Sequence, residues 1–325
     1  MTLQVAQAEW AQLSAEWESL LRRGAFPTVF QTPLWHSVWW QELGRQAELR
    51  LASVREGDAL VGVAPLMLQG ETLTFLGDTD LWDYHECIVE KGREEEFHAA
   101  LFDWLVRQRW KVLDLRSLPQ GSPTLGYLPA LADAQGYAVE VTNEDVSPGV
   151  RLPSTWDEYL EALSNKDRHE LRRKLRRLES QGVHRWYAVN GAASLEGALE
   201  DFFVLMRDSR QDKAVFLTPQ RETFFRRMAQ ELARAGILKL FFMELEGRRV
   251  AAALCFDYCG TRFLYNSGYN PEYGALSVGL LLKAMCLKQA IEEGKGYFDF
   301  LRGNERYKYN LGAKDVGLHR LVVSR

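Results

Sequence analysis

The sequence predicts an α/β protein made of two similar modules, each with a mixed, mainly antiparallel sheet flanked by helices. Three observations lead to this prediction. Apolar runs separated by tight, Gly-containing turns occur in groups of three, which is typical of antiparallel strands. Each group is followed by a long helical pattern and then by a short strand. The whole order occurs twice within 325 residues, a length that suits two hydrophobic cores better than one.

The predicted strands form two meanders. The turns Glu56-Gly57-Asp58 and Glu246-Gly247-Arg248 occupy the same place in the two copies, and Gly allows the chain to reverse there. The expected strands are 49–54, 59–68 and 73–76 in the first copy and 237–245, 250–258 and 262–266 in the second. We interpret this repeated order as a tandem duplication.

A helix and a short strand follow each meander. The helices are expected at 94–109 and 277–293, and the strands at 112–115 and 298–301. An additional helical block precedes the second meander, with segments 155–163, 165–181, 195–210 and 219–235. Pro148, Gly149 and Pro153 interrupt the periodicity between the copies, so we expect modules at 1–147 and 148–325.

Composition excludes several classes of protein. A net charge of -4 and a pI near 6.0 give no general attraction to nucleic acid or acidic lipid. Neither a signal peptide nor an apolar run of membrane-spanning length is recognised, so no membrane insertion and a cytoplasmic location are expected. The cysteines Cys87, Cys255, Cys259 and Cys286 lack the spacing of a zinc motif, so free thiols and no metal are expected.

Several strings resemble the GNAT superfamily of acyltransferases, and within it the CelD-type (BioF-like) branch. They are FQTPLW at 30–35 with Trp39 and Trp40, Asp83-Tyr84, the basic helix 166–177, GYNP at 268–271, and FDFLRG at 298–303 with Tyr307-Lys308. This branch is distantly similar to the Fem peptidoglycan aminoacyl transferases, which also carry two GNAT-like modules. The resemblance implies an acyltransferase, above all an N-acetyltransferase, whose donor is acetyl-CoA or another acyl-CoA.

The start of the second-copy helix is the expected donor site. A helix N-terminus offers unpaired N–H groups and a partial positive charge, which suit a pyrophosphate. The predicted donor-binding residues are Ser277, Val278, Gly279, Leu280 and Leu281. In the GNAT pattern this loop carries two small residues, whereas here Gly279 supplies one and Leu281 replaces the other. An ordinary Ser cap is the alternative interpretation.

The first copy provides an internal comparison. Its helix opens with Glu94, Glu95 and Glu96, and three carboxylates at this position would repel a phosphate. We therefore expect only the second module to bind acyl-CoA. The first module is expected to be structural or to lie on the acceptor side.

The resemblance also implies catalytic residues near the C-terminus. A GNAT-type general acid corresponds to Tyr307, and a Fem-type lysine that stabilises developing charge corresponds to Lys308. In the first copy, Asp83 is a candidate base, and Tyr84 and His85 are candidate substrate contacts beside it. Tyr269 occupies the matching loop of the second copy. Surface or core roles remain open for each of these residues.

The segment 165–177 is strongly basic, with Arg168 and Arg172 in one i, i+4 row. Three interpretations remain open: a solvated helix face, a clamp for an anionic acceptor or for the donor phosphates, and a tRNA-binding surface. Apart from tRNA, a nucleic acid partner is not expected.

The preferred function is direct acyl transfer to an amine or hydroxyl of a small-molecule, saccharide or peptide acceptor. The sequence contains no Gly-x-Ser-x-Gly nucleophile motif, which favours a route without a covalent enzyme intermediate. Two alternatives remain: an aminoacyl-tRNA-dependent Fem-like transferase, and a non-catalytic GNAT-like scaffold in polysaccharide assembly.

Overall fold

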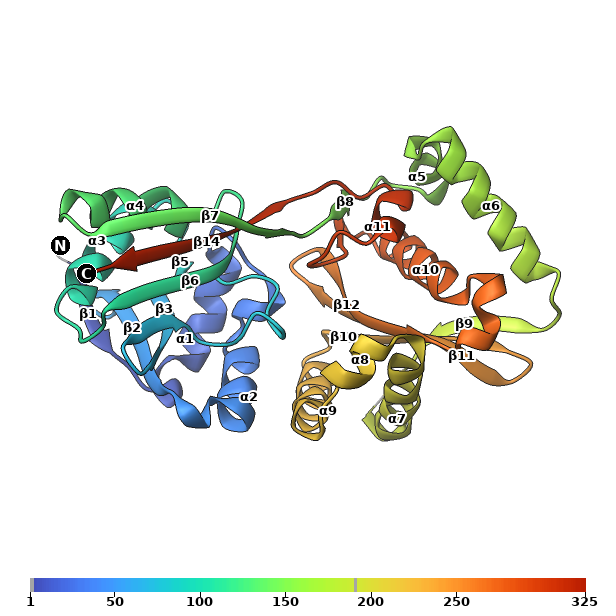
Figure 1. Ribbon diagram of the computed structural model, residues 1–325, viewed down its shortest axis with the longest axis horizontal. Coiled ribbons are helices and arrows are strands. Elements are labelled where there is room, and N and C mark those ends of the chain that lie inside the picture. The colour runs from blue at the N-terminus through green and yellow to red at the C-terminus, as the bar shows by residue number, and fades with distance from the viewer. Residues whose placement is uncertain (1–2, 190–191) are drawn as a thin grey trace. The chain divides into compact units, whose positions relative to one another are not determined.

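The computed structural model describes residues 3–189 and 192–325 (Figure 1). The chain divides into two compact units, one formed by Met1–Val146 with Val316–Arg325 and the other by Ser147–Asp315. The sequence-based division assigned the last ten residues to the second module. In the structure their strand β14 (Gly317–Ser324) lies between β6 and β7 of the first sheet.

The first unit is built on one twisted sheet. Its strand order is β1-β2-β3-β4-β6-β14-β7, and β5 pairs with β3. The bounds are β1 Gln4–Gln7, β2 Glu48–Glu56, β3 Ala59–Gln69, β4 Thr72–Phe75, β5 Ile88–Val89, β6 Val112–Pro119 and β7 Ala138–Val146. The β4–β6 pair is parallel, whereas the other pairs between these strands are antiparallel.

Helices complete the first unit. They are α1 Trp10–Arg23, α2 Pro33–Leu43, α3 Glu94–Leu105 and α4 Pro123–Ala134, with short 3-10 turns at Val29–Gln31 and Gly44–Gln46. Phe97, Leu101 and Leu105 lie on one face of α3 and are buried in the core of this unit, as the helical spacing predicts. The helix ends four residues before the predicted Arg109.

The second unit has its own sheet, in the order β8-β13-β12-β11-β10-β9. The strands are β8 Gly149–Arg151, β9 His184–Ala188, β10 Leu238–Leu245, β11 Arg248–Tyr258, β12 Thr261–Tyr269 and β13 Tyr297–Asp299. The helices are α5 Trp156–Ala162, α6 Asn165–Glu179, α7 Ala192–Ser209, α8 Gln211–Phe216, α9 Pro219–Arg234, α10 Val278–Glu292 and α11 Arg306–Asn310, with a 3-10 turn at Pro271–Leu276. Figure 1 shows α10 on one face of this sheet and α7 and α9 on the other.

Both units repeat one topology, which confirms the predicted fold class. In each, a three-stranded antiparallel meander leads to a helix and then to a strand parallel to the third meander strand. In the second unit, β13 pairs with β12 at only three positions, from Thr261 to Phe263. Beyond Phe263 the two chain segments separate, and the start of α10 lies at this end of β12.

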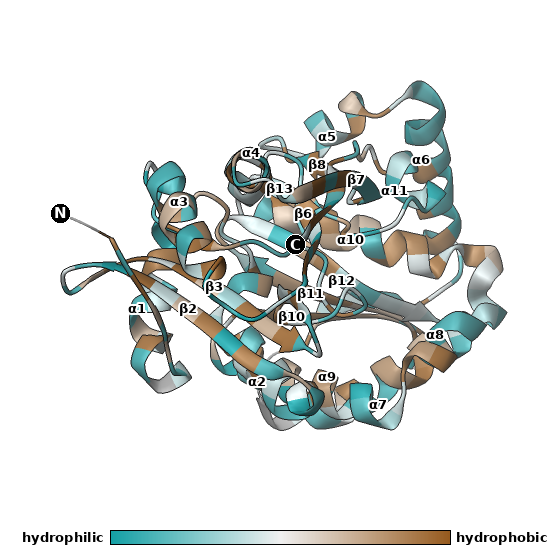
Figure 2. Cartoon of the chain, turned by 60° about the vertical axis from the view of Figure 1, so that its left-hand side comes forward, coloured by the Kyte–Doolittle hydropathy of each residue, from teal (hydrophilic) through white to brown (hydrophobic). Residues whose placement is uncertain are grey.

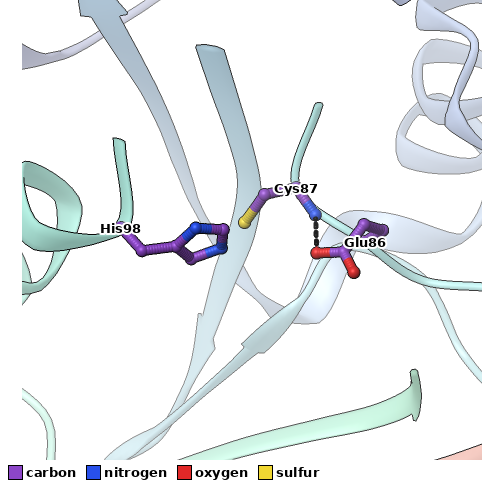
Figure 3. A group of neighbouring side chains, drawn as sticks. All are labelled: Glu86, Cys87 and His98. Atoms are coloured by element: carbon purple, nitrogen blue, oxygen red, sulfur yellow. Dashed lines mark hydrogen bonds between the residues drawn. The ribbon is translucent and has the colours of Figure 1, made fainter. Parts of the chain in front are cut away.

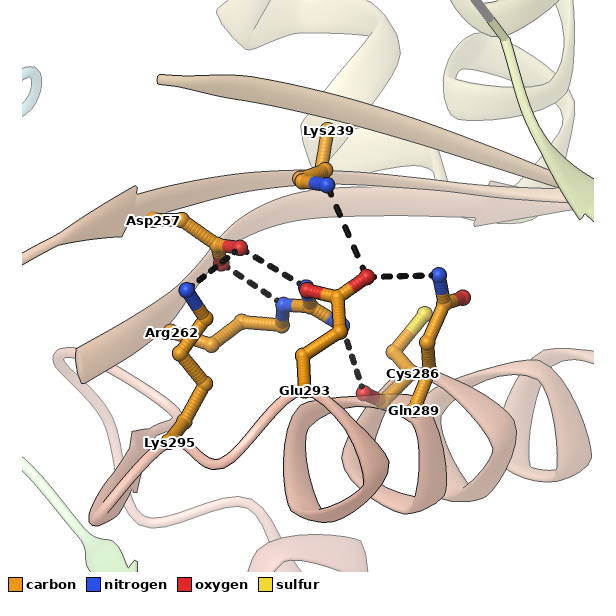
Figure 4. Close-up of polar contacts among 7 residues, drawn as sticks. All are labelled: Lys239, Asp257, Arg262, Cys286, Gln289, Glu293 and Lys295. Atoms are coloured by element: carbon orange, nitrogen blue, oxygen red, sulfur yellow. Dashed lines mark hydrogen bonds and ion pairs between the residues drawn. The ribbon is translucent and has the colours of Figure 1, made fainter. Parts of the chain in front are cut away.

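A buried ion network fixes α10 to the sheet (Figure 4). The Arg262 guanidinium is fully buried and donates to the carboxylate of Asp257 at 2.7 and 2.8 Å. It also donates to Glu293 at 2.6 Å and to the backbone carbonyl of Cys286 at 3.0 Å. Because every arm of the guanidinium has a partner, the buried charge is compensated, and the C-terminal half of α10 is held against β11 and β12.

Candidate functional site

An open pocket of about 250 Å³ lies at the N-terminus of α10. It is lined by Tyr269, Gly274, Ser277, Val278, Gly279, Leu280, Lys283 and Tyr307. Four of the five predicted donor-binding residues therefore line one cavity, together with Tyr269 and Tyr307. Leu281 does not line the pocket, and its side chain is fully buried in the hydrophobic core.

Ser277 does not act as an ordinary helix cap. Its backbone is left-handed, with φ of 58°, and its side chain caps no N–H group of α10. Instead its Oγ accepts a hydrogen bond of 3.2 Å from Lys174 Nζ on α6. The N–H groups of the first turn have no acceptor within the helix, and this turn contains no acidic residue. The helix start and a lysine together create a site suited to an anion.

Gly279 has a packing role that the sequence does not reveal. A Cβ placed there would lie 3.0 Å from Cδ1 and 3.2 Å from Cγ of Tyr269. The absence of a side chain at this position thus lets the Tyr269 ring approach α10 closely. The ring forms part of the pocket wall for the same reason.

Lys283 is a pocket residue that sequence reasoning missed. Its side chain is buried, and its Nζ donates to the Gly279 carbonyl at 3.3 Å. The same Nζ lies 4.6 Å from the centre of the Tyr307 ring, a cation–π contact. Burial lowers the pKa of Lys283 to about 8. A signal was present, because Lys283 is the one charged residue in the stretch 278–287.

A second lysine, Lys213 of α8, is held near β12. Its Nζ donates to Asn266 Oδ1 at 3.0 Å and to the Ser267 carbonyl. Burial, together with the positive charges of Lys283 and Arg210, lowers the pKa of Lys213 to about 7. No sequence pattern distinguished this lysine from a surface charge.

Tyr307 and Lys308 occupy different environments. Tyr307 lines the pocket, and burial raises the pKa of its hydroxyl well above the usual range, so the hydroxyl keeps its proton. Lys308 is buried, and its Nζ donates to the carbonyls of Leu301 and Arg302 at 2.7 Å and of Gly303 at 2.8 Å. In this arrangement Lys308 holds the 301–303 turn and does not line the pocket.

The basic helix α6 touches the pocket through Lys174. Arg172 is exposed, and Arg168 is half-buried and bonded to Asn165 Oδ1 at 2.5 Å. Neither arginine lines the pocket. In Figure 2 the ribbon of α6 is mostly teal, which reflects its many charged residues.

The candidate residues of the first unit lie in an aromatic environment. His85 is buried and stacks against Phe75 and Trp82, with ring centroids 5.6 and 5.4 Å away. Tyr84 is buried with its ring near Phe26 and Phe30, whereas Asp83 is half-buried. The α3 helix of this unit opens with three glutamates, unlike the start of α10.

Comparison with known proteins finds one family match, which lies within the second unit. The family described as "Acetyltransferase (GNAT) domain" matches residues 165–309. No curated protein matches the chain significantly. No helix in the described ranges combines the length and apolar character needed to cross a membrane.

Solved structures share the whole fold at low sequence identity. FemX matches with a TM-score of 0.67 at 12% identity, covering 98% of this chain and 96% of that chain. The C-terminal domain of a putative lysylphosphatidylglycerol synthetase from Agrobacterium fabrum matches with 0.58 at 10% identity, covering 98% and 93%. A tandem GNAT protein from the clavulanic acid biosynthesis pathway matches with 0.51 at 15% identity, covering 98% of both chains. Residues 165–309 thus match the GNAT acetyltransferase domain model, and the chain as a whole shares the fold of a tandem GNAT protein.

Proposed function

We propose that this protein transfers an acyl group from acyl-CoA, above all acetyl-CoA, to an amine or hydroxyl. The acceptor is a small molecule, a saccharide or a peptide. The observation that carries the proposal is the start of α10, where a first turn without acidic residues lines an open pocket and Lys174 contacts the pocket residue Ser277. This combination suits the pyrophosphate of coenzyme A.

The reaction is a direct transfer. The acceptor nitrogen or oxygen attacks the thioester carbonyl, a tetrahedral intermediate forms, and the C–S bond breaks as the thiolate leaves. The acceptor loses a proton and the thiolate gains one. Tyr307 is the candidate donor of that proton. Lys283 lies against the Tyr307 ring, and its pKa of about 8 is closer to neutral pH. Lys283 is therefore better suited than Tyr307 to proton transfer. Lys308 holds the 301–303 turn, which precedes Tyr307 in the chain.

The variant Ser277→Asp tests the donor site with little risk to the fold. Asp tolerates the left-handed backbone and stabilises a helix start. Its charge, however, opposes a phosphate, and its carboxylate would pair with the Lys174 ammonium and neutralise it. We expect coenzyme A affinity to fall at least about tenfold, since an adjacent like charge at about 4 Å costs on the order of 1–4 kcal/mol. Isothermal titration with acetyl-CoA and with coenzyme A measures this change.

Gly197→Asp is the matched control, because Gly197 is exposed on α7 and a side chain there meets no neighbour. Its affinity should equal that of the wild type. No binding to the wild type at millimolar donor, or equal binding by Ser277→Asp, would contradict the proposed donor site.

The exposed basic face of α6 favours a second candidate, an aminoacyl-tRNA-dependent transfer. Arg172, Arg176 and Arg177 are exposed on this helix, and such a face binds a phosphate backbone with strong salt dependence. If tRNA is the donor, raising salt from 50 to 200 mM should weaken its binding by about tenfold or more. A tRNA affinity that does not change with salt excludes this candidate.

A further inference from the structure

A group of three metal-ligating side chains lies in the interior of the first unit. Glu86 and Cys87 precede β5, and His98 belongs to α3. All three are buried, and one ligand atom of each lies within 4.8 Å of the others. Figure 3 shows the imidazole and the thiol directed toward one another, with the Glu86 carboxylate beside Cys87.

The imidazole of His98 is oriented by a neighbouring carbonyl. Its Nδ1 lies 2.7 Å from the Glu94 backbone oxygen, which can only accept a hydrogen bond. Nδ1 therefore carries the proton, and Nε2 presents a lone pair to the cluster. This is the arrangement in which histidine binds metals, with the second nitrogen held by a hydrogen bond.

The hydrogen bonds of the cluster favour Glu86 over His98. The Glu86 carboxylate accepts from the Cys87 N–H at 2.8 Å and from the Ser122 hydroxyl. The Thr124 hydroxyl lies 3.1 Å from His98 Nε2 and donates to Glu86 Oε1, and it is also bonded to the Cys87 thiol. One hydroxyl hydrogen serves one acceptor at a time. Among the hydrogen bonds of the described residues, Thr124 provides the one side-chain contact to His98 Nε2. A cation would give His98 Nε2 and the Cys87 sulfur a partner of their own, and would take the place of part of the hydrogen bonding at Glu86.

We propose that Glu86, Cys87 and His98 form a structural Zn²⁺ site. Zinc accepts nitrogen, sulfur and oxygen ligands in tetrahedral geometry, whereas a thiolate disfavours Mg²⁺ and Ca²⁺. Binding replaces the thiol hydrogen of Cys87, so one proton leaves as the Zn–S bond forms. The two charges of the metal then balance one thiolate and one carboxylate, and the buried site is neutral.

The fourth position belongs to the Thr124 hydroxyl or to a water. A cavity of about 10 Å³, close to the smallest that holds a water, is lined by Glu86 and Cys87. The metal would link the segment before β5 to α3 and to the start of α4, where Ser122 and Thr124 lie. The sequence predicted no metal, because His98 is brought to Glu86 and Cys87 only by the fold.

Metal content of the full-length wild type is the first test. The protein is purified without chelators, its zinc is measured by mass spectrometry, and apo protein is titrated with Zn²⁺ and with Co²⁺. We expect one metal per chain and, with Co²⁺, a thiolate charge-transfer absorption band. Absence of zinc uptake at micromolar metal overturns the proposal.

Variants then locate the site. Cys87→Ser and His98→Gln should each weaken Zn²⁺ binding by more than about 100-fold, since even outer-shell changes cost 10–100-fold. Cys259→Ser, which removes an exposed thiol, should bind like the wild type and keep the Co²⁺ band. If Cys87→Ser does not fold, His98→Gln decides: loss of the Co²⁺ band in this variant supports the site, and an unchanged band overturns it. Unchanged binding by Cys87→Ser also overturns it.

Discussion

At the scale of single residues, Lys283 links the stability of the second unit to its function. A lysine whose pKa is lowered to about 8 by burial binds its proton less tightly in the folded chain than in the unfolded one. Below pH 8 this difference destabilises the fold, and stability recovers as the pH rises from about 8 toward the ordinary lysine value. At about 1.4 kcal/mol per pKa unit, the cost at neutral pH is on the order of 3 kcal/mol.

Lys283→Met should therefore change stability and binding in opposite directions. Removing a buried charge should raise the unfolding temperature at pH 7, and the gain should shrink as the pH approaches 10. The same change should weaken acetyl-CoA binding. In the wild type we expect the affinity to fall above pH 8, where Lys283 loses its charge, and this fall should be absent from the variant. Calorimetry and titration across pH 6–10 measure both effects.

Lys288→Met is the control on the same helix, since Lys288 is half-exposed and paired with Glu292. It should leave both properties nearly unchanged. A Lys283→Met variant that is less stable and binds normally would show that the lysine is structural.

The residues of the site were predictable only where the signal is local. Ser277 to Leu280 could be recognised because a helix start is visible in consecutive residues. The contact of Lys174 with Ser277 joins residues 103 positions apart, so no sequence window contains it. The pKa shifts of Lys213 and Lys283 depend on burial by several elements and could not be predicted from residue type.

At the scale of elements, the position of α10 depends on Arg262. Arg262→Met would leave the Asp257 carboxylate, which is nearly buried, with Lys295 at 3.3 Å as its remaining cationic partner. Breaking a buried ion pair from one side costs about 3–5 kcal/mol. We expect a loss of this size in the free energy of unfolding, measured by urea denaturation.

A double variant distinguishes ion pairing from packing. Adding Asp257→Leu to Arg262→Met removes the uncompensated carboxylate, so part of the stability should return. Arg248→Met, at an exposed position of β11, should have little effect. If Arg262→Met is as stable as Arg248→Met, the network does not anchor the helix.

At the scale of the whole molecule, the repeated topology was predictable, but the return of the C-terminal strand β14 to the first sheet was not. The meander turns and helical spacings identify both copies because each is a local pattern. The strands β7 and β14 escaped prediction because their pairing is long-range: Leu321 of β14 faces Val141 of β7 and Leu115 of β6. A contiguous boundary at 147/148 consequently separates β14 from the sheet that contains it.

The placement of β14 makes the first unit dependent on the last residues of the chain. Leu318, Leu321 and Val323 are fully buried, and Arg320 pairs with Asp114 at 2.7 Å. Deleting 316–325 would expose three apolar positions, each worth about 1.5–3 kcal/mol, and would separate β6 from β7. We expect the first unit to unfold at a much lower temperature and to become sensitive to proteases, as measured by calorimetry and limited proteolysis.

The second unit, 147–315, should remain resistant, because its sheet contains no strand from this segment. An unchanged first transition after the deletion would contradict the central position of β14.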